Sequence, residues 1–600
     1  MIYEITKQSP MDETVDFCGL LSKVKNLKAK DARFITITTN DLNDKEVELI
    51  YHFEDDKQVS SIRLLAEKGK PIQSITSLYL AAFIAENELQ DLFDLRFEDL
   101  AVDFEGEMLK EASSPMTLLK PATGPQPPIF RKPGSCRMEC PGNVNIPKYI
   151  REIERGDPCA AYNTITNNAP IPAILGRVCF APCQDGCRQQ LETKNIQIRA
   201  LKRYAADKFS ETNGGYKRDI QCKPASGKKV AVVGGGPSGV TATYYLGILG
   251  HEVTLFERND YLGGAMAWGI PKYRLPKDLM NEELMARLDE VGAEVKLNTN
   301  ISSLDKLLTE YDAVYLALGA DNCNSLRCEG EDSEGIINFI DFLTAVNVRN
   351  ETPKLGKHVV VIGGGNSAVD TARTAVRLGA EEVTLYYRRT ENEMPASIHE
   401  IQGAMEEGVN FDFLSSQIKI YPGKPLKIYF QSMVPGPPDE SGRRRPVSIE
   451  GSGATVEADT IITSIGYYGQ VPAEMNVEVN RRGHIVIDEN GKTNREKVWA
   501  GGDAAYGTSS VIAAIRDARI AASEIDKYLG GTGLPDDEPD LEENVPRPIN
   551  RDELEEMPQV DLPEVDPDTR IQSFIEVEKC FETCTAIKEA GRCWRCDWNE

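Results

Sequence analysis

Two glycine-rich turns constrain the fold of this chain more than any other feature of its sequence. Residues 229–239 (KVAVVGGGPSG) and 359–370 (VVVIGGGNSAVD) each join an apolar, strand-like run to a helix-forming stretch. The first turn has the spacing GxGxxG, and the second has alanine in the last position. Such a turn bends tightly at the first glycine, admits a pyrophosphate at the second and packs helix on strand at the third. The sequence therefore predicts two Rossmann-like dinucleotide-binding units.

The strand that follows each turn ends in a different kind of residue. Glu257 ends the first of these strands, where a carboxylate accepts hydrogen bonds from ribose hydroxyls. The strand 383–387 is followed by Arg388 and Arg389, and a guanidinium pairs with a ribose 2′-phosphate that a carboxylate would repel. This order predicts an FAD site first and an NADP(H) site second, although the two arginines also fit a solvated charged patch.

Apolar strands at 311–320, 461–466 and 498–503 complete the two units. Asp503 is predicted to bind the ribityl or pyrophosphate part of FAD, or else to cap the next helix, whose N-terminus can stabilise negative charge on the flavin. No catalytic side chain is predicted, because flavin–nicotinamide chemistry needs orientation more than an acid or base. The residues predicted to bind the two nucleotides are Gly234, Gly236, Pro237, Ser238, Gly239, Glu257, Arg258, Gly319, Gly363, Gly365, Asn366, Ser367, Ala368, Arg388, Arg389, Gly466, Gly502, Asp503, Ser510 and Val511.

Nine of the 14 cysteines lie in tight groups, which are typical of metal or iron–sulfur ligands. The grouped cysteines are Cys136, Cys140, Cys179, Cys183, Cys187, Cys580, Cys584, Cys593 and Cys596. The other five are interpreted as structural thiols, because none has a partner at ligand spacing: Cys18, Cys159, Cys222, Cys323 and Cys328.

The charge of the chain excludes some classes of partner. With 68 Lys and Arg against 94 Asp and Glu, the net charge is −26. Nucleic acids and anionic membranes attract basic surfaces, so neither is expected as the main partner. No apolar run approaches about 18 residues, so no membrane span is expected. The N-terminus lacks a secretory pattern, and we expect a cytoplasmic protein.

The long motifs of the central body resemble those of the small subunit of NADPH-dependent glutamate synthase. They are KVAVVGGGPSG, LGGAMAWGIPKYRLPK, VVVIGGGNSAVDTARTAVRLGA, YRRTENEMPA and AGGDA, and the resemblance covers roughly 134–530. The same module occurs in electron-bifurcating ferredoxin:NADP oxidoreductases and in dihydropyrimidine dehydrogenase. The resemblance implies that Gly263 and Gly264 line the FAD site and that residues 394–396 follow the NADP-binding arginines.

The N-terminal module resembles a different family. Residues 34–39 and 47–53 are predicted strands, and 77–93 is a predicted amphipathic helix. The stretch 75–99 (ITSLYLAAFIAENELQDLFDLRFED) is similar to the 30-kDa subunit of respiratory complex I. This resemblance implies an α+β docking module that assembles into a multi-subunit electron-transfer complex.

The glutamate synthase resemblance also implies ligand sets for the cysteines. The tail sequence 589–593 (EAGRC) matches a piece that precedes the first cysteine group in relatives, so the tail is expected to fold back. One 4Fe–4S cluster would then take Cys136, Cys187, Cys593 and Cys596. A second would take Cys140, Cys179 and Cys183, and its fourth position falls on Lys202, whose ammonium is no ligand.

Several alternatives stay open at these clusters. The second cluster could use another ligand, be of a three-iron type or be missing. Cys580, Cys584, Cys593 and Cys596 could form a cluster of their own, a third in the chain, or bind a tetrahedral zinc.

The expected fold is α/β, with two nested Rossmann-like domains, a helical iron–sulfur domain and an N-terminal α+β domain. The expected boundaries are 1–110 for the docking module, 111–133 for a Pro-rich linker, 134–227 for the iron–sulfur domain, 228–345 and 462–530 for the FAD domain, 346–461 for the NADP(H) domain, 531–570 for an acidic linker and 571–600 for a Cys-rich tail.

The resemblance implies an oxidoreductase that passes electrons between NADP(H), FAD and 4Fe–4S clusters. Its expected partners are flavin or iron–sulfur subunits of one complex, with ferredoxin or a hydrogenase among the candidates. Bifurcation and transhydrogenation are activities that the resembled module also supports. The alternative function is that of a glutamate synthase small subunit.

Overall fold

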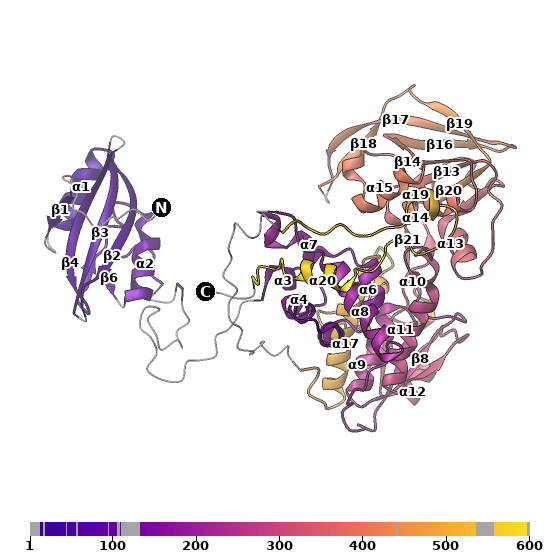
Figure 1. The fold of residues 1–600 in the computed structure, drawn as a ribbon, viewed down its shortest axis with the longest axis horizontal. Helices are drawn as coiled ribbons and strands as arrows, with labels where there is room; N and C mark the ends of the chain where they lie inside the picture. Colours follow the sequence, from indigo (N-terminus) through magenta and orange to yellow (C-terminus); the bar gives the residue numbers. More distant parts are fainter. Residues whose placement is uncertain are drawn as a thin grey trace. The chain divides into compact units, whose positions relative to one another are not determined.

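The computed structural model describes most of the chain, which divides into a unit within 1–129 and a unit within 130–600 (Figure 1). The described residues are 12–15, 19–43, 45–55, 58–93, 95–104, 108–109, 133–191, 193–439, 442–535 and 557–596. Cys18 and residues 111–132 of the expected Pro-rich linker lie outside them, as do residues 536–556 of the expected acidic linker.

The first unit is an α+β fold, as predicted. Its sheet has the order β1-β4-β3-β2, in which β1 is parallel to β4 and the other pairs are antiparallel. The elements are β1 (Asp12–Val15), α1 (Leu20–Ala29), β2 (Arg33–Asp41), β3 (Glu46–Asp55), β4 (Gln58–Glu67), β5 (Pro71–Gln73), α2 (Ala82–Phe93) and β6 (Arg96–Glu98). The predicted helix begins only at Ala82, because Glu86 accepts hydrogen bonds from Ser74 and the backbone N–H of Ile75 and so holds the preceding turn against the helix.

The second unit begins with a bundle of short helices that carries five of the grouped cysteines. The helices are α3 (Ser135–Met138), α4 (Ile146–Glu154), α5 (Pro158–Asn168), α6 (Pro172–Val178), α7 (Pro182–Asp185) and α8 (Ile198–Asn213). Proline lies in the first turn of α4, α5, α6 and α7, where its missing N–H removes no helix bond. The prolines thereby divide this segment into several short helices.

A parallel sheet of order β22-β10-β7-β8-β9 follows the bundle. Its strands are β7 (Lys229–Val233), β8 (Glu252–Phe256), β9 (Glu294–Lys296), β10 (Ala313–Leu316) and β22 (Val498–Ala500). The helices of this domain are α9 (Pro237–Ile248), α10 (Ala265–Trp268), α11 (Lys277–Glu290), α12 (Asp305–Glu310), α16 (Asp503–Tyr506) and α17 (Val511–Tyr528). The strand β22 follows the inserted domain in the sequence. The first sheet therefore combines strands from before and after the insertion.

The inserted domain has its own parallel sheet, of order β12-β20-β13-β14-β15. Its strands are β12 (Ile336–Asn338), β13 (His358–Gly363), β14 (Glu382–Tyr387), β15 (Asn410–Phe413) and β20 (Thr460–Ser464), with helices α13 (Phe339–Asn347), α14 (Asn366–Arg377) and α15 (Ile398–Glu406). The same domain contains a second sheet, which is antiparallel. Its strands are β16 (Ser415–Tyr421), β17 (Leu426–Pro438), β18 (Arg444–Ser448) and β19 (Ala454–Ala458). The short pair β11 (Asn322–Cys323) and β21 (Tyr467–Tyr468) joins the entry to the exit of the insertion.

The expected boundaries of the inserted domain are wrong at both ends. Residues 336–345 and 462–464 were expected in the first domain, yet β12 and β20 pair with each other and β20 pairs with β13. The physical reason is that apolar strands of a parallel sheet have no local sequence mark of which sheet they join. The insertion therefore runs from about β12 to β20.

The C-terminal segment 557–596 lies along the second unit, where it runs from the helical bundle to the inserted domain and back to the bundle (Figure 1). It contains α19 (Pro567–Arg570) and α20 (Thr583–Ala590), and α20 packs on α4 and α8. Residues 557–570 were expected to belong to an extended linker, but Gln559 and Val560 bond to the helical bundle and its tail, and Glu564 and Arg570 pair with the inserted domain. Charge pairing explains this difference, because the buried Arg570 meets Glu406 and Glu407 of the inserted domain and Glu564 meets His399.

Arg570 anchors this segment to α15 and the residues that follow it. Its fully buried guanidinium lies 2.7 Å from Glu407, 2.9 Å from Glu406 and 2.8 Å from Glu564. Burial alone would raise the pKa of Glu407, but the guanidinium groups of Arg377 and Arg373 outweigh burial and lower that pKa to about 2. The segment is thus held by the buried, ionised Glu407 and by the more exposed Glu406 and Glu564.

We expect Arg570→Met to release residues 564–574 from the inserted domain. Breaking a buried ion pair costs about 3–5 kcal/mol, so the local free energy of opening should fall by a comparable amount. Hydrogen exchange measured by mass spectrometry would report the release as faster exchange in this segment. Lys579→Met is the matched control, because Lys579 is exposed. Equal exchange in the two variants would contradict the anchoring role of Arg570.

Candidate functional site

A cavity of about 300 Å³ lies at the carboxyl ends of the strands of the first sheet. It is also lined by the start of α14 in the inserted domain, so both domains share it. Of the residues predicted to bind nucleotides, those that line it are Gly234, Gly236, Pro237, Ser238, Glu257, Arg258, Gly264, Gly319, Asn366, Ser367, Gly502, Asp503, Ser510 and Val511. The crevice outside the carboxyl ends of such strands is where α/β sheets bind ligands.

The remaining predicted residues do not line this cavity. Gly239 and Gly263 lie behind its wall, where they allow close packing. Gly363, Gly365 and Gly466 lie where strands of the inserted sheet end, Ala368 lies in the first turn of α14, and Arg388 and Arg389 follow β14. These last six residues would serve the second nucleotide rather than the first.

The turn at Gly234 is possible only without a side chain. Gly234 has a φ of +111°, and a Cβ there would lie 2.1 Å from the carbonyl oxygen of Ala317. A Cβ at Gly239 would lie 1.8 Å from the carbonyl oxygen of Gly234. Glycine at both positions lets α9 begin directly at the cavity, so the first N–H groups of that helix are available to a phosphate.

Glu257 has a structural role in the turn besides the predicted one. Its buried carboxylate accepts hydrogen bonds from the backbone N–H groups of Gly235 at 2.7 Å and Asn259 at 2.8 Å. These bonds tie the end of β8 to the glycine-rich turn. The carboxylate still lines the cavity, where ribose hydroxyls are its predicted partners.

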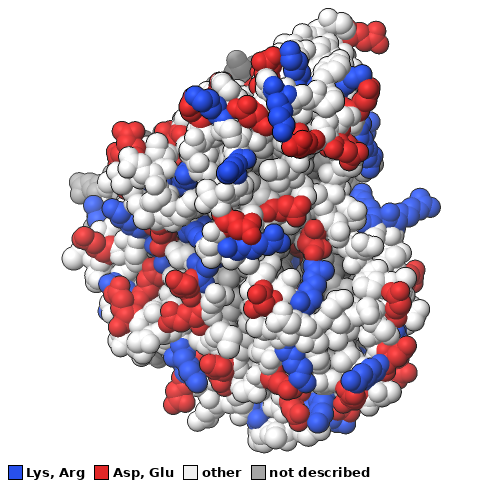
Figure 2. Space-filling view, turned by 90° about the vertical axis from the view of Figure 1, so that its right-hand side faces the viewer, with Lys and Arg blue, Asp and Glu red and all other residues white. Residues whose placement is uncertain are grey.

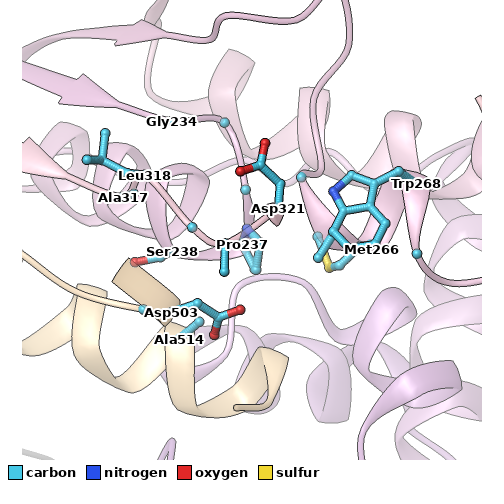
Figure 3. Close-up of a pocket in the computed structure, with 18 of the residues that line it drawn as sticks. Gly234, Pro237, Ser238, Met266, Trp268, Ala317, Leu318, Asp321, Asp503 and Ala514 are labelled. Atoms are coloured by element: carbon cyan, nitrogen blue, oxygen red, sulfur yellow. The ribbon is translucent and has the colours of Figure 1, made fainter. Parts of the chain in front are cut away.

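Asp503 and the start of α17 form the opposite wall, as Figure 3 shows for Asp503 and Ala514. Burial raises the pKa of Asp503 to about 6, against a hydrogen bond from the backbone N–H of Ser509. The N-cap of α17 is Ser510, whose hydroxyl accepts from the N–H of Ala513 at 3.3 Å. Asp503 is therefore not the cap of that helix, and its carboxylate is available to a ligand.

The sequence interpretation missed a group of aromatic side chains where the two domains meet. The rings of Trp268 and Tyr467 lie 5.6 Å apart between centroids, and Phe339 lies 6.2 Å from Trp268 and 5.7 Å from Tyr467. All three line the cavity. The run AMAW at 265–268, which contains Trp268, could have revealed this group. The sequence interpretation used only the two glycines before that run.

Arg274 joins the two domains beside the same cavity. Its guanidinium donates to both carboxylate oxygens of Asp370 on α14, at 2.8 and 3.0 Å, and lies 2.9 Å from Glu400 on α15. Both partners are buried, so the pairs are shielded from water. They hold the start of α14 at the cavity.

The two arginines after β14 have different surroundings. Arg389 is buried and its guanidinium lies 2.7 Å from Asp439, at the end of the β17 arm. Arg388 is exposed and forms no ion pair with any described residue. Arg388 is thus the more available of the two for a phosphate.

Seven of the grouped cysteines meet in the helical bundle. Cys140, Cys179, Cys183 and Cys187 are buried there, and no disulfide joins any of the described cysteines. Burial is the main cause that holds the pKa of Cys136 far above its usual range, followed by the charges of Cys593, Cys183, Cys187 and Cys596. The tail thiols therefore lie close to Cys136, and this set of thiols fits an iron–sulfur cluster.

The EAGRC motif explains how the tail reaches this position. Glu589 and Arg592 are fully buried and lie 2.7 Å apart. Glu589 accepts from the N–H of Gln197 at 2.9 Å, and Arg592 donates to the carbonyl oxygen of Lys194 at 2.7 Å. This pair fixes the chain immediately before Cys593 to the loop that leads into α8.

Cys580 and Cys584 are not among the thiols whose charges act most on Cys136. Burial and the charge of Asp207 raise the pKa of Cys580 to about 12, and the other groups that act on it most are arginines and a lysine. Cys584 is exposed. The arrangement favours the fold-back ligand set over a cluster or zinc site made by the four tail cysteines alone.

The cysteines of the second expected cluster lie next to the cavity. Val178 and Phe180, the two neighbours of Cys179, line the cavity wall. A cluster held by Cys140, Cys179 and Cys183 would therefore be the one nearer to FAD.

Among the described helices, none is long and apolar enough to cross a membrane.

Three family profiles match the chain in an order that agrees with this architecture. They are the 30-kDa subunit of respiratory-chain NADH dehydrogenase over residues 11–106, the 4Fe–4S domain II of dihydropyrimidine dehydrogenase over 131–214, and pyridine nucleotide-disulphide oxidoreductase over 228–518.

Named relatives resemble most of the chain. The beta subunit of NADPH-Fe(3+) oxidoreductase from Geobacter sulfurreducens is 36% identical over 77% of this chain and 75% of its own length. The beta subunit of NADP(+)-dependent formate dehydrogenase from Moorella thermoacetica is 35% identical over 77% and 70%, respectively. The small chain of NADPH glutamate synthase from Escherichia coli is 34% identical over 66% and 88%. The chain therefore belongs to the family of FAD- and NADP(H)-binding iron–sulfur oxidoreductase subunits that includes this glutamate synthase small chain.

Proposed function

We propose that this chain exchanges hydride between NADP(H) and its FAD and passes single electrons through its iron–sulfur clusters to partner subunits. The observation that carries the proposal is the composition of one cavity wall, which combines the turn 234–238, the start of α14 and the neighbours of Cys179. FAD, when bound, supplies the exchange between the two-electron chemistry of nicotinamide and the one-electron chemistry of clusters.

The residues of the chain bind and shield the reacting groups. The N-termini of α9 and α17 both reach the cavity through Pro237 and Ser510. Their unsatisfied N–H groups and the positive ends of their dipoles stabilise negative charge on phosphate or flavin. The rings of Trp268 and Tyr467 cover the side that faces the inserted domain and limit the entry of water.

The partner subunits are proposed from the N-terminal unit and from relatives that are named as subunits. A unit that resembles a complex I subunit suits docking into an electron-transfer complex, with a formate dehydrogenase, a hydrogenase or a ferredoxin-linked flavoprotein as candidates. The alternative function is that of a glutamate synthase small subunit, and the similarity to the E. coli small chain favours it. Recovery of a glutamine-dependent amidotransferase with the native chain would favour that alternative.

The expected cytoplasmic location remains part of the proposal.

Protein purified without oxygen is expected to be yellow-brown from bound flavin and iron–sulfur clusters. Addition of NADPH should bleach the flavin absorbance, because the cavity brings nicotinamide to the isoalloxazine ring. Absorbance spectroscopy before and after mixing makes this measurement. A colourless protein with neither flavin nor iron would instead identify the chain as a scaffold with vestigial sites.

We expect Arg388→Ala to weaken NADPH binding about 10- to 100-fold, because charge-assisted hydrogen bonds contribute about 1.5–3 kcal/mol and 1.4 kcal/mol is a factor of ten. NADH has no 2′-phosphate, so its binding should change little. In the double variant that also carries Arg389→Ala, the loss of NADPH binding relative to NADH binding should be at least as large. Calorimetric titration with both nucleotides would measure the effect, with the exposed Arg482→Ala as control. Equal loss for NADPH and NADH would refute a 2′-phosphate role.

We expect Cys593→Ser to lower the iron content by about half and to leave the flavin content unchanged, because Cys593 belongs to one of two proposed ligand sets. Iron analysis per bound flavin would measure this. Cys584→Ser is the control and should retain its iron, since Cys584 is exposed. If Cys584→Ser loses as much iron as Cys593→Ser, the four tail cysteines form their own site and the fold-back set is wrong.

A further inference from the structure

Lys202 is buried among three cysteines. It lies on α8 and is 3% exposed, while Cys140, Cys179 and Cys183 are at most 9% exposed. These three thiols are the groups whose charges act most strongly on Lys202. A lysine, rather than a fourth thiol, therefore completes this buried group of side chains.

Helix packing brings these side chains together. The helix α8, which carries Lys202, packs on α6, whose C-cap is Cys179, and on α7, which contains Cys183. Lys202 forms no salt bridge with a carboxylate in the described part of the chain. The thiols are thus the available counter-charges for its ammonium.

This set of side chains does not fit a fully protein-ligated 4Fe–4S cluster. Such a cluster takes one protein ligand for each iron, and cysteine thiolates are the usual four. An ammonium has three donors and no lone pair, so it cannot bind iron. The neighbouring set, Cys136 with Cys187, Cys593 and Cys596, offers four thiols. The chain therefore contains one complete set and one that lacks a ligand.

We infer that the site nearer to FAD holds a three-iron cluster on Cys140, Cys179 and Cys183, with the Lys202 ammonium as a charge partner at the fourth corner. This inference rests on the proposed iron–sulfur function of the same cysteines. It also carries an energetic consequence. Net charge near a cluster sets its reduction potential, and a buried cation favours the more negative, reduced form. Lys202 should therefore raise the potential of the cluster that stands between FAD and the second cluster.

The test is electron paramagnetic resonance of the oxidised wild-type protein, purified strictly without oxygen, together with iron and sulfide analysis per flavin. An oxidised three-iron cluster is paramagnetic, whereas an oxidised four-iron cluster is silent and becomes visible only after reduction. We expect both signals, one in each redox state, in the wild-type protein. The oxidised signal should persist after incubation with ferrous iron and dithiothreitol, because the fourth corner has no ligand.

Two substitutions of Lys202 separate the loss of its charge from the gain of a ligand. Lys202→Glu supplies a carboxylate, so the oxidised signal should disappear and the iron per flavin should rise by one atom. Lys202→Met supplies neither charge nor ligand, so the signal should remain and its midpoint potential should fall in a redox titration. Unchanged flavin content would show that both variants fold.

Three results would overturn the inference. The first is a wild-type protein that is silent when oxidised and contains two four-iron clusters. The second is a wild-type signal that vanishes as added ferrous iron is taken up. The third is a protein with iron for one cluster only. In each case flavin and the cluster seen after reduction would still support the proposed function, whereas loss of both would refute that function itself.

Discussion

Ion pairs between buried side chains join the segment 557–596 to the rest of the second unit. Glu589 and Arg592 pair with no contact to water and bond to the loop before α8. Arg570 does the same against Glu407 beside α15. Breaking such a pair leaves an isolated charge in a medium where it is poorly solvated, so the docked state is strongly favoured over a partly docked one. The position of Cys593 beside Cys136 depends on these contacts.

The same segment connects the two functional halves of the second unit. It touches the inserted domain through Arg570 and the helical bundle through α20. Between these contacts the cavity is shared by the first sheet and by α14, and Arg274 holds α14 in place through Asp370. The arrangement places a nucleotide cavity and the cysteines in one unit, with Val178 and Phe180 between them. Short separations of this kind are what electron transfer requires of a protein.

The structure also shows where local patterns were sufficient and where they were not. The turn at Gly234 was predictable from its glycine spacing, and the need for glycine at Gly239 comes from a contact with the carbonyl oxygen of Gly234 within one strand–turn–helix unit. The pairing of Arg389 with Asp439 was not predictable, since the partner lies 50 positions away on a separate arm. The placement of β12 and β20 in the inserted sheet was missed for a related reason. Their apolar sequences suit either sheet.

The sequence by itself determined the two nucleotide-binding turns, the cysteine groups and the order of the domains, because each depends on residue types at fixed short spacings. Tertiary structure alone decided which residues from distant segments share a site. It brought Trp268, Phe339 and Tyr467 to one side of the cavity, and it set Lys202 among three thiols. The physical reason is that close packing and the pairing of buried charges act between segments that are neighbours only after folding.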